Sequence, residues 1–535
     1  MSQQPKGTTR IEEYIPDAEI AVFNGFPENP DSDFYMQTQI HCYPPYEREK
    51  QIASIQARKV GHSHKKFEHE VETYEWTSGI IRNVIPKAQP ADRQRALQVV
   101  FDWLEGQTAG KAHPWASMES FMRYQHYTAH HGYDYIGSEI GANVAAYNLS
   151  IAFTRGAAKQ YNARLGLGNV QAWFIDYSLW NYLGMVNYSG NPMMYQDPGW
   201  LGSDTAVSSN DYSGQSVSAV RRGYYMTYMA GAQWLINEAG GQGGFYAETE
   251  EDGHYRLSPH GEMFREFFDF VNRHPDRGVC YVPFGVVLPF AHGLPFGHWN
   301  EPKVFETFPL TAGDRMTVAL FDLFFPRSWG DPTNFGTYGG RDENAQQTES
   351  PYGDTMDVLL QNAPQRVLNS YPVLILSGDL QLTAEEQARF IAYVQQGGTL
   401  VQNIAHADLL PEFDYGKGEV ITYGPAYDAT GLKAVLEQLC VKLIPFTVSG
   451  RVQTLYTVKD GGLVVTVINN EGIHHKYNEL VEIDETAAQT VTVTYTGDKP
   501  VMAVRDWLTD AELPAAAVQR VEIPAGGVAV LEFIL

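Results

Sequence analysis

The sequence predicts an α/β protein. Its N-terminal part is expected to be a (β/α)8 barrel of the TIM type, complete or shortened, followed by a doubly wound, flavodoxin-like α/β domain and a small antiparallel β-sandwich. The chain has 535 residues, whereas one hydrophobic core organises only about 250 to 300. Between about residues 110 and 275, short apolar runs alternate with helical patterns, as in a parallel sheet. From about residue 450 onward, apolar and polar residues alternate with period two, as in an antiparallel sandwich.

Four strands, each with a following helix, can be placed in the barrel region. Apolar runs predict strands over Ala112–Met118, Tyr133–Ile140, Ala172–Trp180 and Ala232–Ala239. Apolar residues at helical spacing predict helices over Glu119–His130, Asn143–Tyr161, Gln215–Ala230 and Ser258–Arg273. Upstream, the sequence predicts strands at Glu19–Phe26 and Tyr35–Tyr43 and a helix at Ala91–Glu105. These elements assign residues 1–277 to the barrel.

A strand, a capped helix and a second strand indicate the doubly wound domain, which we assign to residues 278–447. The apolar run Pro372–Ser377 precedes Thr383, which is suited to cap a helix, and that helix ends before Gly397-Gly398. The strand Thr399–Asn403 follows directly, as in a doubly wound sheet. An earlier apolar strand, Val282–Phe290, has no acidic residue suited to catalysis. Residues 448–535 are assigned to the sandwich.

The charge and the cysteine content exclude several classes of function. The 38 basic and 63 acidic residues give a formal net charge of −25, which repels nucleic acids and anionic membranes, so neither is an expected partner. The widely spaced Cys42, Cys280 and Cys440 predict neither a disulfide framework nor a zinc site. The three histidines of residues 62–69 lie among charged residues and are interpreted as a solvated face, so no metal is expected. The polar N-terminus and the lack of a long apolar run predict a cytoplasmic protein.

Three carboxylates follow apolar runs at the ends of predicted barrel strands: Glu139, Asp176 and Glu238. Side chains at the carboxyl ends of barrel strands converge on one pocket. Glycoside cleavage needs one carboxylic acid to protonate the leaving oxygen and a second carboxylate as nucleophile or base. We therefore expect Glu139 and Glu238 to be the catalytic pair, with Asp176 as a third participant or a sugar ligand. The alternative is that one of the pair is a buried structural acid.

The segment Tyr371–Val401, with the sequence YPVLILSGDLQLTAEEQARFIAYVQQGGTLV, closely resembles the amidotransferase-like trimerisation domain of family 42 β-galactosidases and related clan A glycosidases. Those enzymes consist of a (β/α)8 barrel, this domain and a small β-sandwich, and the closing segment PAGGVAVLEFIL resembles the last strands of such sandwiches. The resemblance covers roughly residues 130–535, and it implies a homotrimer that needs no cofactor. A true amidotransferase has a Cys nucleophile at the turn where this chain has Ser377-Gly378-Asp379, so the domain is expected to be a scaffold.

The Asn237-Glu238 dipeptide is similar to the pair in which clan A enzymes place their acid/base, where the Asn binds the 2-hydroxyl group of the substrate. Those enzymes carry the pair on their fourth strand, whereas counting back from the middle domain puts Glu238 on the last strand. The same count puts Asp176 on the seventh strand, where the clan has a Glu nucleophile, so the roles of the carboxylates stay open. Four further residues near the predicted strand ends are expected to line a sugar subsite, with core packing as the alternative for the aromatics: Tyr177, Trp180, Trp115 and His113.

These patterns lead us to expect an exo-acting, retaining glycoside hydrolase that cleaves a terminal sugar from a short oligosaccharide. A first alternative is a catalytically silent carbohydrate-binding or scaffold protein, which the short N-terminal half and the departures at Asp176 and Glu238 would favour. A second alternative is a polysaccharide lyase that uses Tyr and His as base and acid. Binding without turnover would indicate the first, and an unsaturated product that absorbs in the ultraviolet would indicate the second.

Overall fold

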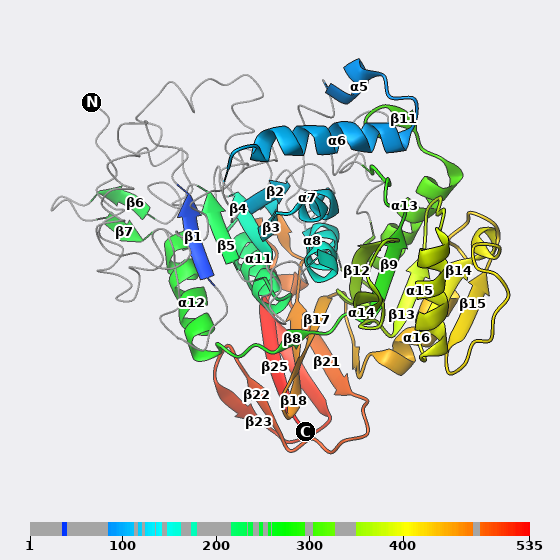
Figure 1. The fold of residues 1–535 in the computed structure, drawn as a ribbon. Coiled ribbons are helices and arrows are strands. Elements are labelled where there is room, and N and C mark those ends of the chain that lie inside the picture. Colours follow the sequence, from blue (N-terminus) through cyan, green and yellow to red (C-terminus); the bar gives the residue numbers. More distant parts are fainter. Residues whose placement is uncertain are drawn as a thin grey trace.

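The computed structural model of the protein contains two parallel sheets, an antiparallel sandwich and the helices that connect them (Figure 1). It describes residues 35–39, 84–111, 116–119, 124–133, 135–141, 147–161, 173–178, 216–232, 234–238, 246–249, 255–257, 259–294, 303–326, 349–474 and 482–535. Within these ranges, no helix has the length and apolarity that crossing a membrane requires.

The first sheet has five described strands in the order β1-β5-β4-β3-β2, and every pair is parallel. The strands are β1 (Tyr35–Gln39), β2 (Ala116–Glu119), β3 (Tyr135–Gly141), β4 (Trp173–Ser178) and β5 (Trp234–Glu238). They coincide with the four strands predicted for the barrel and with the upstream strand predicted from Tyr35, whereas the strand predicted at Glu19–Phe26 lies outside the described residues. Pairing of β1 with β5 places the first described strand of the chain at one edge of this sheet, and β2 lies at the other edge.

Helices follow these strands where apolar periodicity and capping residues predict them. They are α6 (Arg93–Thr108), α7 (Gln125–His131), α8 (Tyr147–Tyr161), α11 (Val217–Met229) and α12 (Pro259–Arg273), and a short helix α5 (Ile85–Ala88) precedes them. Asp92 caps α6 and Ser216 caps α11 through their side-chain oxygens. A small hairpin of β6 (Tyr246–Thr249) and β7 (Tyr255–Leu257), which the sequence analysis did not predict, separates β5 from α12.

The second sheet is also parallel and has the strand order β12-β9-β13-β14-β15. Its strands are β9 (Phe284–Leu288), β12 (Met356–Leu360), β13 (Val373–Leu376), β14 (Thr399–Asn403) and β15 (Glu419–Tyr423). Helices α13 (Ala312–Phe324), α14 (Gln365–Leu368), α15 (Ala384–Gln395) and α16 (Leu432–Leu443) accompany it, and β10 (Lys303–Val304) pairs with β11 (Phe308–Pro309). Thr383 caps α15 in a capping box with Glu386, as the sequence predicts.

The C-terminal strands form a six-stranded sheet, β23-β22-β25-β18-β17-β8, and a three-stranded sheet, β16-β21-β24, whose described pairs are all antiparallel. Their bounds are β8 (Val279–Cys280), β16 (Phe446–Val448), β17 (Gln453–Lys459), β18 (Gly462–Ile468), β21 (Gln489–Tyr495), β22 (Ala503–Asp506), β23 (Ala511–Leu513), β24 (Val518–Ile523) and β25 (Val528–Ile534), with β19 (Ile473–His474) and β20 (Glu482–Ile483) in a separate hairpin. Strand β8 adds to this sheet although it precedes the whole second sheet in sequence. One hydrophobic cluster contains buried residues from the first sheet, the second sheet and the sandwich, from Ile85 to Val530.

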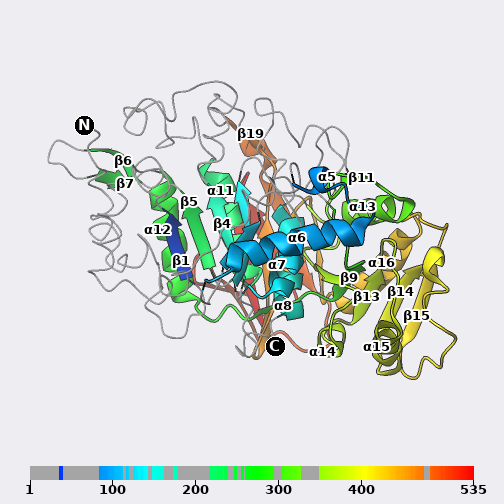
Figure 2. The ribbon, with the colours of Figure 1, turned by 45° about the horizontal axis from the view of Figure 1, so that its top comes forward.

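Helices α7 and α8 lie between the first sheet and β12 of the second sheet (Figures 1 and 2). Helix α8 approaches β12 closely at Val358: a Cβ atom on Gly156 would lie 1.8 Å from the Val358 carbonyl oxygen. His126 of α7 also reaches this carbonyl, through Nε2 at 3.0 Å. Because a carbonyl oxygen only accepts, Nε2 carries the proton, and burial lowers the pKa of His126 to about 3. A neutral histidine and a glycine thus permit two sheets to share one helical layer.

Candidate active site

The strand register brings together the positions of the three predicted carboxylates. Glu139 on β3 pairs with Asp176 on β4, and Asp176 pairs in turn with Ile236 on β5. Glu238 lies two residues further along β5, where it pairs with Ser178 and with Gln39 of β1. With standard strand spacings, the Cα atoms of Glu139 and Asp176 are about 5 Å apart and those of Glu139 and Glu238 roughly 12 Å apart. All three positions lie in the carboxyl-terminal halves of three neighbouring parallel strands, with Glu238 as the last residue of β5.

The alternation of residues along the strands assigns these positions to one face of the sheet. Ser138 contacts the helices through its hydroxyl group, and Leu235 is fully buried. Ser138, Ile175 and Leu235 are register partners, so they belong to the face that packs against the helical layer. Successive strand residues alternate between the two faces. Glu139, Asp176 and Glu238 occupy the alternate positions, which belong to the opposite face.

Tyr177 and Asn237 are register partners of each other, but they occupy the same alternating set as Ser138. Two consecutive residues of a regular strand belong to opposite faces, so Asn237 and Glu238 are not on the same side of β5. The substrate-binding roles of Tyr177 and Asn237 stay predictions. Three other residues expected to line the subsite lie outside the described residues: His113, Trp115 and Trp180.

A chain of buried hydroxyl groups lies directly behind the carboxylate positions. Gln125 Nε2 of α7 donates to Ser138 Oγ at 2.9 Å, and Ser138 Oγ lies 2.5 Å from Thr154 Oγ1 of α8. Thr154 Oγ1 donates to the Ser150 carbonyl oxygen at 2.8 Å. Since that donation uses the only proton of the Thr154 hydroxyl, Ser138 must donate to Thr154. The sequence analysis missed these residues, although polar side chains inside an apolar strand and on a buried helix face were a signal.

The helical layer is fixed to the second sheet by a buried ionic cluster around Asp357 of β12. Arg155 Nε and Lys159 Nζ each donate to the Asp357 carboxylate at 2.6 Å, and the Tyr371 hydroxyl donates to it at 2.7 Å. Burial alone would raise the pKa of Asp357, but the positive charges of Arg155 and Lys159 hold it below its usual value. Asp357 is fully buried, and these three partners occupy both carboxylate oxygens. The cluster therefore has the character of a structural joint.

A second buried carboxylate, Asp354, connects α8 to the sandwich without an ion pair. Asn148 of α8 and Gln453 of β17 donate to its two oxygens, each at 2.8 Å. Gln453 also accepts from Asn470, whose side-chain oxygen accepts from Arg222 of α11 at 2.6 Å. Burial raises the pKa of Asp354 to about 6, while the two amide hydrogen bonds oppose that shift.

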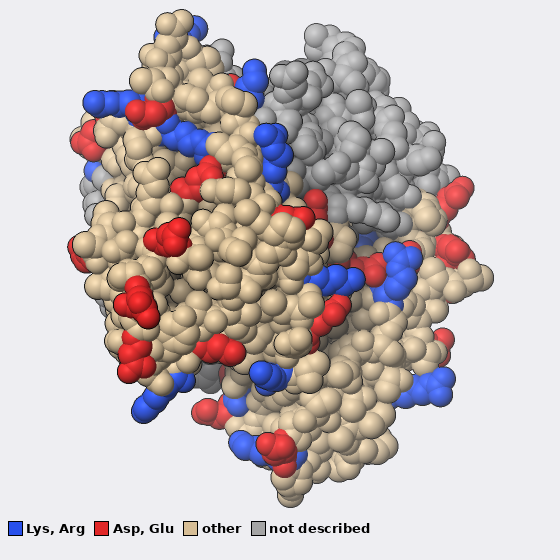
Figure 3. Space-filling view, turned by 90° about the vertical axis from the view of Figure 1, so that its right-hand side faces the viewer, with Lys and Arg blue, Asp and Glu red and all other residues tan. Residues whose placement is uncertain are grey.

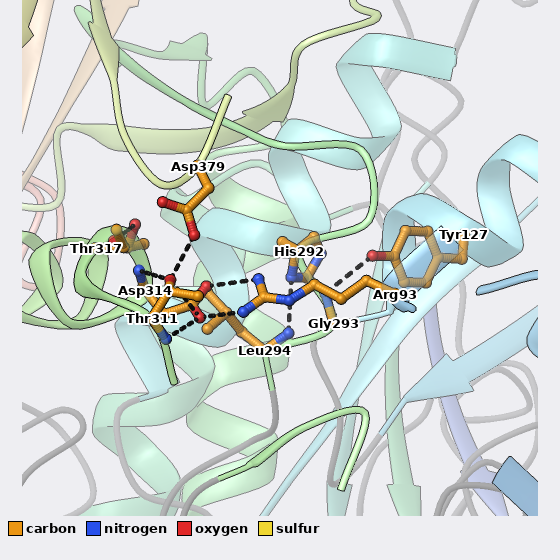
Figure 4. A network of polar contacts seen from close by, with 10 residues as sticks. Arg93, Tyr127, His292, Gly293, Leu294, Thr311, Asp314, Thr317 and Asp379 are labelled. Atoms are coloured by element: carbon orange, nitrogen blue, oxygen red, sulfur yellow. Dashed lines mark hydrogen bonds and ion pairs between the residues drawn. The ribbon is translucent and has the colours of Figure 1, made fainter. Parts of the chain in front are cut away.

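The turn Ser377-Gly378-Asp379 after β13 is held by internal contacts (Figure 4). Ser377 is fully buried, and its hydroxyl lies 2.8 Å from Thr317 Oγ1 of α13. Asp379 contacts Thr311, the N-cap of α13. Gly378 has a φ of 84°, a conformation that favours glycine, and its carbonyl oxygen accepts a hydrogen bond from His406 Nε2 at 2.7 Å. The scaffold role of this domain stays a prediction.

The region beside this turn carries a strong ion pair that fixes α6. Arg93 donates to both oxygens of Asp314, at 2.9 and 2.5 Å, and Asp314 also accepts from the backbone of Thr311 (Figure 4). Figure 3 shows the face of the molecule over the second sheet, where acidic and basic side chains of described residues are interspersed and much of the surface is uncharged. A nucleic-acid interface would need clustered Lys and Arg. This face therefore offers no such cluster among its described residues.

The described residues contain no group of three or more His, Cys, Asp and Glu side chains that could hold a metal ion. Cys280 and Cys440 are free thiols, and burial raises the pKa of each. Cys42 and the three histidines of residues 62–69 lie outside the described residues.

No protein-family model and no curated protein matches the chain. Among solved structures, the chain is similar to a β-galactosidase from Bacillus circulans sp. alkalophilus, with 14% identity, a TM-score of 0.44 and coverage of 82% of this chain and 66% of that chain. It is also similar to an exo-carrageenase from Bacteroides ovatus, with 9% identity, a TM-score of 0.44 and coverage of 83% and 56%. For an α-L-fucosidase isoenzyme from Paenibacillus thiaminolyticus the values are 9% identity, a TM-score of 0.41 and coverage of 83% and 71%. The chain spans less than two thirds of the length of the first two proteins. A function for this chain is therefore argued from its own residues.

Proposed function

We propose that this chain is a glycoside hydrolase that cleaves a terminal sugar from a short oligosaccharide with carboxylates on neighbouring strands of the first sheet. The observation that carries the proposal is the register of β3, β4 and β5, which aligns the positions of Glu139, Asp176 and Glu238 at one end and on one face of the sheet. Carboxylates from separate parallel strands are the arrangement that acetal cleavage requires. Hydroxyl and amide groups of the helical layer hold the opposite face.

In this proposal one carboxylic acid protonates the leaving oxygen as the glycosidic bond breaks, and a second carboxylate stabilises or attacks the anomeric carbon. Glu139 and Glu238 form the catalytic pair, and Asp176 between them binds a sugar hydroxyl group or takes part in the reaction. We propose a retaining reaction, for which the two carboxyl groups lie about 5 to 5.5 Å apart. Because glutamate side chains are long, two of them can converge from Cα atoms roughly 12 Å apart across the mouth of a curved sheet.

A screen of chromogenic glycosides tests the proposal, with Glu139→Gln, Glu238→Gln and Asp176→Asn as variants. We expect wild type to release the chromophore, and kcat for each of the two Gln variants to fall at least about 100-fold, because each loses a group that acts in proton transfer or nucleophilic attack. Glu385→Gln is the matched control, because Glu385 is an exposed carboxylate of α15 whose ion pair among the described residues is with Arg389. Binding of sugars without turnover in wild type would contradict the proposal in favour of a silent binding protein.

The proposed assembly is a homotrimer formed through residues 278–447. Light scattering coupled to size-exclusion chromatography tests it, with a mass of three chains as the expected result. A monomer at micromolar concentration would contradict this part of the proposal, and it would leave the assignment of the carboxylates intact.

A further inference from the structure

We propose that Ser138 and Thr154 are positioning residues for Glu139, and that the second sheet, through α8, is the support that fixes them. The inference rests on the proposed function, since it assigns to these hydroxyl groups a task in the reaction of Glu139. Neither residue belongs to the expected substrate-facing set. Both act through the backbone of β3.

The hydroxyl chain has a single consistent direction. Gln125 donates to Ser138, Ser138 donates to Thr154, and Thr154 donates to the Ser150 carbonyl oxygen. Ser138 and Thr154 are fully buried and Gln125 is 2% exposed, so water cannot readily replace a lost partner. Each hydroxyl group gives its one proton and accepts one, which leaves little freedom for Ser138 to shift along the sheet.

Ser138 lies in a strand segment in which glycines stand two residues before and two residues after Glu139. The local sequence is Gly137-Ser138-Glu139-Ile140-Gly141, and glycines inside a strand contribute no side chain to packing. Adjacent Cα atoms are about 3.8 Å apart, so an anchored Ser138 also fixes the origin of the Glu139 side chain. Displacement of a reacting group by about 1 Å can cost a large factor in rate.

The hydroxyl chain is connected to the second sheet through the residues that follow Thr154. Thr154 is followed directly by Arg155, which binds the buried Asp357 together with Lys159. Gly156, the next residue, rests on the backbone of Val358. The three residues 154–156 thus connect the hydroxyl chain behind Glu139 with β12. In this way the scaffold sheet supplies a rigid support to the strand that carries the proposed acid or nucleophile.

The second sheet contains an internal control for this arrangement. Ser377, at the end of β13, contacts Thr317 of α13 at 2.8 Å, and Thr317 donates to the carbonyl oxygen four residues earlier, as Thr154 does. Both pairs join a serine, inside β3 or directly after β13, to a helix threonine in a fully or almost fully buried setting. Only the first pair is adjacent to a proposed catalytic carboxylate.

The test compares Thr154→Val, Thr154→Ser and Thr317→Val in the full-length protein, with the glycoside that wild type cleaves fastest. Valine keeps the shape of threonine but removes the hydroxyl group, whereas serine keeps the hydroxyl group and removes a methyl group. We expect Thr154→Val to lower kcat about tenfold with KM within about twofold of wild type. Thr154→Ser and Thr317→Val should keep kcat within about twofold. Thermal unfolding of each variant shows that it is folded at the assay temperature.

A purely structural role would make Thr154→Ser, which leaves a cavity, as damaging to kcat as Thr154→Val, and would let Thr317→Val lower kcat through stability alone. Equal kcat in Thr154→Val and wild type would overturn the positioning role and leave the proposed function standing. If wild type cleaves no glycoside, the proposed function fails and the positioning role fails with it.

Discussion

The two parallel sheets of this protein contain the same buried hydroxyl pair in different settings. In the first sheet Ser138 lies inside β3, and the strand continues through Glu139 to Gly141. In the second sheet Ser377 follows the end of β13, and Gly378 with a φ of 84° turns the chain away. One pair therefore holds a strand in which an acidic residue directly follows the serine, and the other holds a turn. The hydrogen bond between serine and threonine is the same in both pairs. The residue after the serine, Glu139 or Gly378, differs.

The sheets also differ in how their helical cover is used. Helix α8 is buried on almost all sides because it lies between the first sheet and β12, whereas α15 of the second sheet has exposed residues along one face. Arg155 and Lys159 extend from α8 into the second sheet to reach Asp357. The first sheet thus depends on the second for part of its stability, which can be measured.

The largest expected effect is the loss of the Asp357 joint. Asp357→Ala leaves Arg155 charged and buried without its carboxylate, and we expect the free energy of unfolding to fall by about 3 to 5 kcal/mol in denaturant titrations. The comparison variant is Asp314→Ala, whose partner Arg93 keeps 20% of its side chain exposed and can regain water, so its loss should be about 1 to 3 kcal/mol. Equal losses would show that the joint between the sheets is no stronger than the partly buried pair of Arg93 and Asp314.

The pH dependence of stability tests the other link of α8, through Asp354. Burial raises the pKa of Asp354 in the folded protein to about 6, above the usual value of 3.8, so between pH 4 and 6 the folded state binds more protons than the unfolded state. Stability therefore falls as pH rises through this window, and Asp354 contributes about 3 kcal/mol to that fall. Asp354→Asn removes this titration. In denaturant titrations from pH 4 to 7, the free energy of unfolding of the variant should therefore rise relative to that of wild type as the pH increases. A constant difference between the two proteins would contradict the assignment.

Close packing of α8 on β12 predicts a smaller effect. Gly156→Ala places a Cβ atom against the Val358 carbonyl oxygen, which also accepts from His126. We expect a loss of about 1 to 3 kcal/mol in the free energy of unfolding, because the backbone must move. Gly106→Ala in α6 is the matched control, since nothing lies within 4 Å of the added Cβ atom, and it should stabilise the protein by about 0.5 to 1 kcal/mol. Thermal shifts of the same sign for both variants would contradict the packing.

The smallest expected effect is the difference in stability between variants of the two hydroxyl pairs, Ser138–Thr154 and Ser377–Thr317. Thr154→Val and Thr317→Val should each lower the free energy of unfolding by about 1 to 2 kcal/mol, because each removes the two buried hydrogen bonds of its hydroxyl group while the shape is kept. The two pairs would then be equal in stability and differ only in activity. A difference of more than about 2 kcal/mol between the variants would break the comparison, since stability alone could then explain a loss of kcat.

Much of the fold was predictable because its signals are local. Apolar runs located the strands of the first sheet, and Thr383 marked the start of α15 as a capping residue. The period-two alternation located the sandwich strands. Strand β8, in contrast, was assigned to the middle domain but pairs with β17. Because β8 has only two residues, it shows no periodic pattern, and its partner strand β17 lies more than 170 positions later in the chain.

The candidate site divides in the same way. The sequence determined that acidic residues follow three apolar runs, because that depends on composition and order alone. Only the tertiary structure decided that Glu139 and Asp176 are register partners and that Tyr177 and Asn237 belong to the same alternating set as Ser138. It also decided that Ser138 contacts a helix that is bound to the second sheet. Register and helix packing depend on contacts between residues far apart in sequence, and no local pattern encodes which partner a strand or a helix will meet.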